Sequence, residues 1–226
     1  METETRTGER LDGKDKRLIL AVLLIAVVSV LYTRLNYSAA FPEASIDLRF
    51  SKDHITGMAA SFLRERGLSP AGFRSLTLFD PDEEARLYLE REMGLGEANR
   101  LMQAEVSVWR WRARWFRPPE KEEMAVFLSP GGKLVGFDHT VAEEAPGARL
   151  EKQAARALAE SFLSRQTETR HRLIEEQLQE RPNRHDYFFT WEQEGFRAKD
   201  ATYRRTVLVQ GDRIGRYKEY LYIPEQ

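Results

Sequence analysis

The hydrophobic residues of the chain form one long uninterrupted run near the N-terminus and several short periodic runs after it. Residues 18–33 contain no charged side chain, and basic residues stand on both sides of them. At 1.5 Å per residue this run covers about 24 Å, and the uncharged residues 35–41 extend it beyond Arg34, whose long side chain can reach the membrane surface. The pattern predicts one membrane-spanning helix over residues 18–37.

Two amphipathic helices are predicted in the rest of the chain. Residues 52–66 place apolar side chains at helical spacing, and residues 150–165 repeat the design, with Ser-Phe-Leu at 61–63 and again at 161–163. Strand-like runs follow each helix, with hairpin turns expected at Gly131-Gly132 and Gly211-Asp212. The expected strands are 72–79, 105–117, 122–129, 133–141, 185–193, 202–210 and 213–223, with an acidic helix at 81–93.

These elements predict an α+β fold with two similar units behind the transmembrane helix, each a helix packed on an antiparallel sheet. The first unit is expected at residues 45–147 and the second at 148–226, divided where Pro and Gly punctuate the chain. Residues 1–17 form a tail. The alternative is one continuous α+β domain in which the Phe-Leu pair recurs by chance.

Composition narrows the class of protein. Hydrophobic residues make up 42% and charged residues 31%, which excludes a disordered chain or one with several membrane spans. Lys and Arg number 35 against 36 Asp and Glu, so the balance of charge does not favour a nucleic acid as partner. Cysteine is absent, which excludes disulfides, thiolate zinc sites and cysteine nucleophiles.

The charges that flank the apolar run predict its orientation. Basic residues precede it at Arg6, Arg10, Lys14, Lys16 and Arg17, and an excess of Lys and Arg keeps an end in the cytoplasm. Everything after about residue 36 is then expected outside the cytoplasm. A cleaved signal peptide, with the small residues 38–40 before the cut, is the alternative.

The stretch 105–117 carries the most unusual pattern, because tryptophans and arginines alternate in it. Period two places Trp109, Trp111 and Trp115 on one face of a strand and Arg110, Arg112 and Arg114 on the other. The structural interpretation buries the tryptophans under a helix and pairs the arginines with Glu120, Glu122 and Glu123. The functional interpretation makes this strand a groove for an acidic or extended partner. A second aromatic stripe includes Trp191. The candidate binding residues are Trp109, Arg110, Trp111, Arg112, Arg114 and Trp191.

The remaining polar residues predict no catalytic residue, metal ligand or cofactor site. The four histidines are scattered, without the i, i+4 spacing that places two imidazoles on one helical face for zinc. Neighbouring pairs such as Asp138-His139 would point to opposite faces of a strand. The turn at 181–184 is expected to be structural.

Several separated motifs resemble the N-terminal extracytoplasmic region of some bacterial CPBP intramembrane metalloproteases, the CAAX-protease and bacteriocin-processing family. They are W-R-W-R-A-R-W-F-R-P at 109–118, E-E at 122–123, L-V-G-F-D-H at 134–139, A-P-G-A at 145–148, R-P-N-R-H-D-Y-F-F-T-W-E at 181–192, Q-G-D-R-I-G at 210–215 and Y-I-P-E at 222–225. The likeness covers residues 41–225 and concerns the accessory region, because the catalytic motif Glu-Glu-x-x-x-Arg is not matched: Tyr88 follows Glu83-Glu84, and Ala148 follows Glu143-Glu144. The paired units also resemble PepSY and cystatin-like domains.

The resemblance implies a non-catalytic sensor or regulatory domain in the bacterial cytoplasmic membrane, spanning once with its C-terminal part outside. Its expected partner is a peptide or protein, bound along a strand edge or a concave sheet face. The alternative function is the leading portion of an active intramembrane metalloprotease whose catalytic residues lie beyond residue 226.

Overall fold

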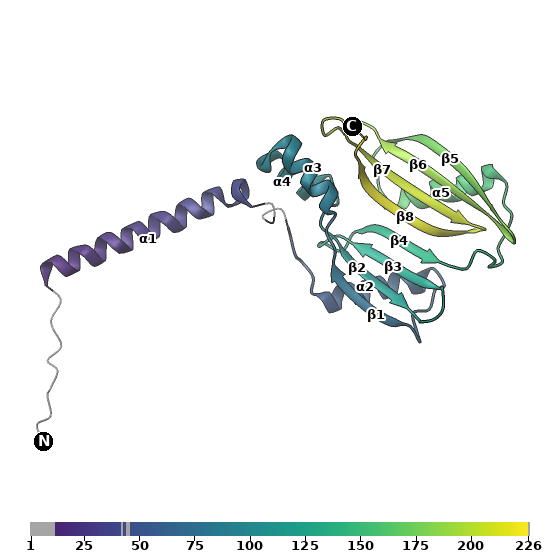
Figure 1. The fold of residues 1–226 in the computed structure, drawn as a ribbon, viewed down its shortest axis with the longest axis horizontal. Coiled ribbons are helices and arrows are strands. Elements are labelled where there is room, and N and C mark those ends of the chain that lie inside the picture. The colour runs from purple at the N-terminus through teal and green to yellow at the C-terminus, as the bar shows by residue number, and fades with distance from the viewer. Residues whose placement is uncertain (1–11, 42, 44–45, 226) are drawn as a thin grey trace, which may run out of the picture.

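The N-terminal apolar segment is a single long helix that stands apart from the rest of the molecule. The computed structural model describes residues 12–41, 43 and 46–225. Arg6 and Arg10, two of the basic residues from which the orientation is predicted, lie outside this part. Helix α1 (Gly13–Ala40) projects away from the sheet (Figure 1). Its candidate membrane span, Gly13–Tyr37, has 25 residues that rise about 38 Å, more than the roughly 30 Å of a bilayer core, and its most apolar 18-residue window is 0% buried. Such a helix fits a single-pass membrane anchor and equally a signal sequence.

The rest of the chain is α+β, as the sequence predicts. Its strands form one eight-stranded sheet in the order β1-β2-β3-β4-β8-β7-β6-β5, with every neighbouring pair antiparallel. The elements are α2 (Lys52–Glu65), β1 (Arg74–Phe79), α3 (Glu83–Met93), α4 (Leu95–Ala104), β2 (Trp111–Phe116), β3 (Glu123–Leu128), β4 (Leu134–Thr140), α5 (Lys152–Gln166), β5 (His171–Arg181), β6 (Arg184–Gln193), β7 (Thr202–Gln210) and β8 (Arg213–Tyr222).

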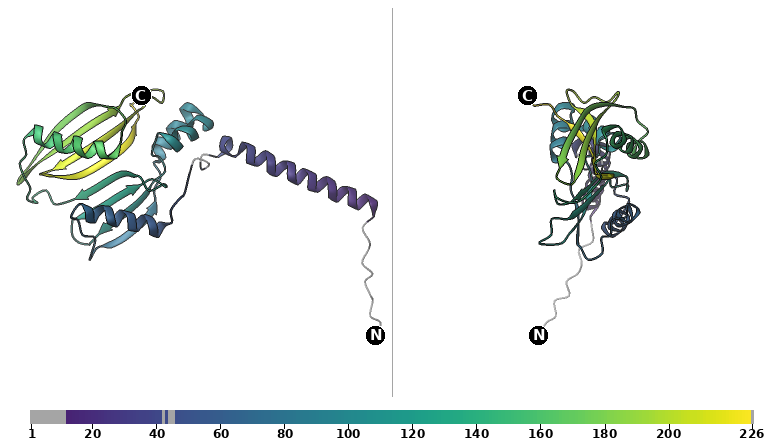
Figure 2. Two further views of the ribbon diagram at one scale, coloured as in Figure 1. Left: turned by 180° about the vertical axis from the view of Figure 1, so that it is seen from behind. Right: turned by 90° about the vertical axis from the view of Figure 1, so that its right-hand side faces the viewer.

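The order of elements repeats along the chain and meets at the centre of the sheet. A helix followed by four strands occurs first from α2 to β4, interrupted by the α3–α4 hairpin, and again from α5 to β8. The fourth strands of the two series, β4 and β8, are neighbours through only three residue pairs: Gly136 with Lys218, Phe137 with Tyr217, and Asp138 with Arg216. This short ladder is called the seam below. Helices α2 and α5 both pack on one face of the sheet (Figure 2).

The repeated Phe-Leu pairs meet beneath the seam. Phe62 of α2 packs edge-on against Phe137 with ring centroids 5.3 Å apart, and Phe162 of α5 packs in the same way against Tyr217 at 5.2 Å. Phe137 and Tyr217 face each other in the seam ladder. One hydrophobic core therefore draws on both halves of the sheet. The expected limits 45–147 and 148–226 stay a prediction.

The α3–α4 hairpin joins the end of α1 to the sheet. It packs on a second apolar cluster that includes Tyr203 of β7 and Leu221 of β8, and the Tyr88 hydroxyl donates to the carbonyl oxygen of Ala198 at 3.2 Å. On its other side, the Asn99 side-chain amide donates to the carbonyl oxygen of Phe41 at 3.1 Å, just after α1 ends. The hairpin thus lies between the apolar helix and the strands β7 and β8 (Figure 1).

Three elements differ from the sequence prediction. Helix α4 and strand β5 were not expected, and the strand predicted over 105–117 begins only at Trp111. The residues before it lose the alternation, because Val106, Val108 and Trp109 are all buried in the second apolar cluster. Strand β5 is rich in Glu and Gln, which strands disfavour, and it is tolerated at a sheet edge where most side chains meet solvent.

Candidate functional site

One face of the sheet carries α2 and α5, and the other face is free of both helices. Side chains alternate along each strand, so residues next to those in the core point to the opposite face. Figure 2 shows α2 and α5 on the same side of the sheet, and the α3–α4 hairpin packs on a separate cluster at one end of it. The side free of α2 and α5 is called the uncovered face. It presents Arg112 and Arg114 of β2, Phe127 of β3 and Lys218 of β8.

A hollow of about 340 Å³ lies on the uncovered face beside the seam. It is called the seam groove, and the residues that matter in it are Arg110, Arg112, Phe127, Gly136, Arg216 and Lys218. A second hollow of about 710 Å³ continues on the far side of the seam toward β5 and β6. Asp138 and Arg216 line both hollows and are joined by an ion pair of 3.0 Å, so this pair forms the ridge between them.

The floor of the seam groove is the ring of Phe127. A Cβ atom placed on Gly136 would lie 3.0 Å from the ring carbon Cδ2 of Phe127, which shows how closely the ring covers this bare backbone position. The guanidinium carbons of Arg110 and Arg112 lie 5.5 and 5.7 Å from the ring centroid. A half-buried aromatic ring flanked by two cations makes a floor that is apolar at its centre and basic at its rim.

Two of the four cations in the seam groove have no ion pair with any described residue. Arg110 is bound to Asp82 at 3.2 Å and donates to the carbonyl oxygen of Asp80 at 3.1 Å, and Arg216 is bound to Asp138. Lys218 is exposed, and the Nε of Arg112 is buried without a hydrogen-bond partner. Arg112 and Lys218 are therefore the two groove cations that can pair with an acidic group from outside the described chain.

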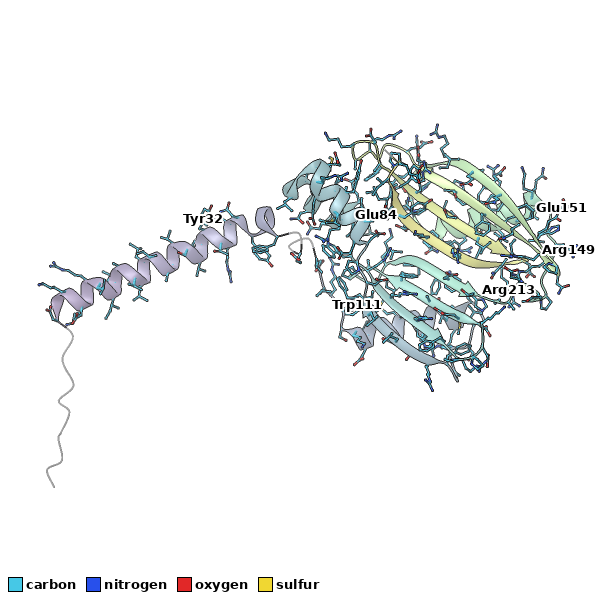
Figure 3. The ribbon with its side chains drawn as sticks, viewed as in Figure 1. Tyr32, Glu84, Trp111, Arg149, Glu151 and Arg213 are labelled. Carbon is cyan, nitrogen blue, oxygen red and sulfur yellow. The ribbon has the colours of Figure 1, made fainter. Side chains whose placement is uncertain are left out.

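The predicted tryptophans are scaffold residues. Trp109 is 6% exposed in the second apolar cluster, and Trp191 is 4% exposed in the main core beside Phe189. Trp111 is half-buried at the start of β2, edge-on to Phe79 with ring centroids 5.2 Å apart, and Figure 3 places it below the α3–α4 hairpin. The period-two alternation holds within β2 and fails before it, where Val108 and Trp109 are both buried in the second apolar cluster.

The predicted pairing of the arginines is correct for one of them. Arg114 donates to both carboxylate oxygens of Glu123 on β3, and this hydrogen bonding raises the pKa of the Arg114 guanidinium. For Arg110 and Arg112 the prediction is wrong. Arg110 reaches Asp82 because β2 begins later than expected, and Arg112 has no carboxylate opposite it, since the residue across the ladder is Phe127. The other two expected partners pair elsewhere, Glu120 with Arg117 and Glu122 with His139.

Four groove residues escaped the sequence prediction: Phe127, Gly136, Arg216 and Lys218. Their signal was the alternation of β8, in which Arg216 and Lys218 share one face and Tyr217 and Leu221 share the other. Glu219 obscures this alternation in the sequence, because it is a charged residue at a buried position and gives both faces of β8 a polar residue.

Glu219 is the centre of a buried polar cluster on the helix-covered face. It accepts hydrogen bonds from the hydroxyls of Tyr203 at 3.0 Å and Tyr217 at 2.6 Å, and it forms a 3.5 Å ion pair with Arg205. Burial, reinforced by the Glu219 charge, raises the pKa of both tyrosine hydroxyls, which therefore stay protonated as donors. Every group of this cluster is used internally, so we assign it to the scaffold.

The turn between β5 and β6 is structural, as predicted. Arg184 is 3% exposed and binds Asp186 with its Nε at 2.8 Å, while its Nη1 donates to three carbonyl oxygens of the segment 142–145. The Asn183 side-chain amide donates to the carbonyl oxygen of Glu144 at 2.7 Å. These bonds fix the connection that leads from β4 to α5.

The seam groove contains no ready-made reaction centre. Among the described residues no group of three or more histidine, aspartate or glutamate side chains is placed to hold a metal ion. Asp138 and His139 point to opposite faces as expected, the first toward Arg216 and the second toward Glu122. Comparison of the chain with known families, curated proteins and solved structures gives no match, so the geometry itself has to carry the functional argument.

Proposed function

We propose that the chain is a membrane-anchored, extracytoplasmic, non-catalytic sensor or regulatory domain that binds an extended peptide or protein segment. The observation that carries this proposal is the uncovered face of the sheet, with the seam groove at its centre. An antiparallel sheet can leave one face in solvent, but such a face is then expected to be evenly polar. The uncovered face instead has a hollow with the half-buried ring of Phe127 as its floor, and two of its cations form no ion pair with a described residue.

The proposal includes a duplicated architecture. The repeated order of a helix and four strands, and the matching pairs Phe62–Phe137 and Phe162–Tyr217, support two related units that resemble PepSY and cystatin-like domains. The resemblance of the motifs to the accessory region of CPBP intramembrane metalloproteases supports a regulatory role for the pair. A site at the junction of two related units suits such a role, because a ligand there contacts both at once.

Peptide selection followed by hydrogen exchange tests the binding function. The full chain in lipid nanodiscs is presented with a displayed library of extended peptides, and the enriched peptides are added at saturating concentration. Binding at the uncovered face slows amide exchange in β2, β3, β4 and β8 and leaves α2 and α5 unchanged. Failure to enrich any peptide, or protection confined to α2 and α5, would overturn the proposal.

Cysteine labelling tests the location. The chain has no cysteine, so Thr5→Cys and Glu160→Cys each introduce a single thiol. A membrane-impermeant maleimide should label the Glu160→Cys protein in cells with a permeabilised outer membrane and reach the Thr5→Cys protein only after lysis. The reverse pattern would place the sheet in the cytoplasm, and a mature chain that begins after residue 40 would show that the helix is a cleaved signal.

A further inference from the structure

The charges of the seam groove identify the chemistry of the segment that it takes. Resting on the proposed function, we infer that the seam groove recognises an acidic extended segment, whose carboxylates are bound by Arg112 and Lys218 while an apolar side chain lies on Phe127. Arg112 and Lys218 come from different halves of the sheet, β2 and β8, and meet at one hollow across the seam.

Arg112 supplies the directional part of this recognition. Its Nε is buried and has no acceptor among the described residues, whereas the guanidinium of its neighbour Arg114 is bound by Glu123. The guanidinium of Arg112 lines the groove, so a carboxylate oxygen entering it can accept a charge-assisted hydrogen bond from this cation, which is about twice as strong as a neutral one. A ligand without an acceptor at this point leaves the cation without an ion pair.

Lys218 supplies the second cation. It projects from β8 into solvent beside the Tyr220 ring, with its Nζ 4.8 Å from the ring centroid, and no carboxylate of the described chain pairs with it. Its partner across the ladder is Gly136, which has no side chain, so nothing on β4 stands between Lys218 and the ring of Phe127. A segment lying along the groove meets cations from both halves.

Three carboxylates line the groove, and Asp80 is the one that opposes this binding, because Asp138 is paired with Arg216 and Glu219 with Arg205. Asp80 lines the same hollow, and its side chain has no ion pair with any described residue. Repulsion between Asp80 and an incoming carboxylate weakens binding. Removing the charge at Asp80 should therefore strengthen the binding of an acidic segment, while removing the charge at Arg112 or Lys218 should weaken it.

Fluorescence anisotropy with the full chain in nanodiscs of zwitterionic lipid tests the inference. The probes are three eight-residue peptides in which pairs of valines alternate with pairs of glutamates, of glutamines or of lysines, so that each face of the extended peptide carries both kinds of side chain. We expect the glutamate peptide to bind at least tenfold more tightly than the glutamine peptide, and its binding to weaken between 0.05 and 0.5 M salt. Arg112→Gln and Lys218→Gln should each weaken it about three- to tenfold, and Asp80→Asn should strengthen it about twofold or more.

Arg213→Gln is the matched control, because Arg213 is an exposed cation at the start of β8 and does not line the seam groove (Figure 3). Circular dichroism verifies folding, and Lys218→Gln, an exposed change, keeps the test decisive if Arg112→Gln misfolds. Equal binding of the glutamate and glutamine peptides, or equal effects of Lys218→Gln and Arg213→Gln, would overturn the inference. If the neutral or basic peptide binds and protects β2, β4 and β8, the proposed function survives without the acidic specificity. If no peptide protects these strands, the proposed function fails as well.

Discussion

Glu219 is a charged residue that the fold buries, so its position in the core could not be predicted from the sequence pattern. It lies on the core-facing side of β8, and it is 3% exposed. The carboxylate is tolerated there because two tyrosine hydroxyls and Arg205 meet it. Removing one member of such a buried ionic group costs about 3–5 kcal/mol, since the other charge is left without compensation.

The imidazole of His171, at the edge of this cluster, is expected to make the free energy of unfolding depend on pH. Burial, together with the positive charge of Arg205, lowers the pKa of His171 from its ordinary 6.5. The folded state therefore takes up the proton less readily than the unfolded state. The contribution of His171 to the free energy of unfolding is therefore fully present above about pH 6.5, and it falls as the pH drops from there toward the pKa of the folded state.

The first prediction follows from that linkage. Urea unfolding of His171→Gln between pH 5 and pH 8 should give a flatter dependence of the unfolding free energy on pH than the wild type shows. His54→Gln is the control for loss of an imidazole, because His54 lies at the surface of α2. Parallel curves for the wild type and His171→Gln would contradict the assignment.

A second prediction concerns Gly211 in the β7–β8 turn. Its φ of 62° is in the left-handed region, and a Cβ atom there would lie 2.9 Å from the backbone nitrogen of Ala148. Gly211→Ala should cost about 1–3 kcal/mol of unfolding free energy, measured in urea. Gly195→Ala is the matched control, since Gly195 has a φ of 77° with open space around it. Equal losses would show that the contact with Ala148 is unimportant.

At the scale of the elements, the sequence predicted those with a clear period or a clear turn. Both amphipathic helices and both glycine hairpins are where periodicity and Gly place them. Strand β5 was missed because an edge strand needs little burial and its Glu and Gln side chains carry no alternation. Helix α4 was missed because Gly94, with a φ of 75°, ends α3 and begins α4 without a linker between them.

The third prediction compares the two helices that cover the seam. Phe162 of α5 is 1% exposed. Phe62 of α2 is half-buried, and the guanidinium of Arg66 lies 3.6 Å from its ring centroid. Phe162→Ala should cost about 3–5 kcal/mol of unfolding free energy, and Phe62→Ala should cost less because part of its site is already open to water. Urea unfolding of the two variants decides the order, and the inverse order would contradict the unequal burial.

At the scale of the whole molecule, the shared core makes the sheet one cooperative structure despite its three-pair seam. The fourth prediction uses the tryptophans, because Trp109, Trp111 and Trp115 lie in the first half and Trp191 lies in the second. In Trp191→Phe the fluorescence reports the first half alone, whereas circular dichroism reports both. We expect their urea midpoints to coincide. Two separated midpoints would show that the halves unfold independently.

The site was only half accessible from the sequence. Alternation in 105–117 predicted that the arginines share a face, and the uncovered face confirms it. The other half of the seam groove comes from β8, about a hundred residues later, and only the pairing of β4 with β8 brings Lys218 beside Phe127. The pairing of β4 with β8 is supported by the packing of Phe62 and Phe162 beneath the seam. Local hydrophobic patterns do not predict which distant strands pair.

The proposed membrane anchoring by α1 bears on the affinity that the proposed binding in the seam groove requires. Eleven residues separate the end of α1 at Ala40 from the start of α2 at Lys52, a connection that can span at most about 40 Å, and Asn99 holds its first residue. With α1 in the bilayer, as proposed, the groove and a partner in the same membrane would meet in a thin layer at an effective concentration far above that of a soluble competitor. A dissociation constant that looks weak for a free peptide would then suffice, and it would make the protein selective for segments displayed at the same bilayer.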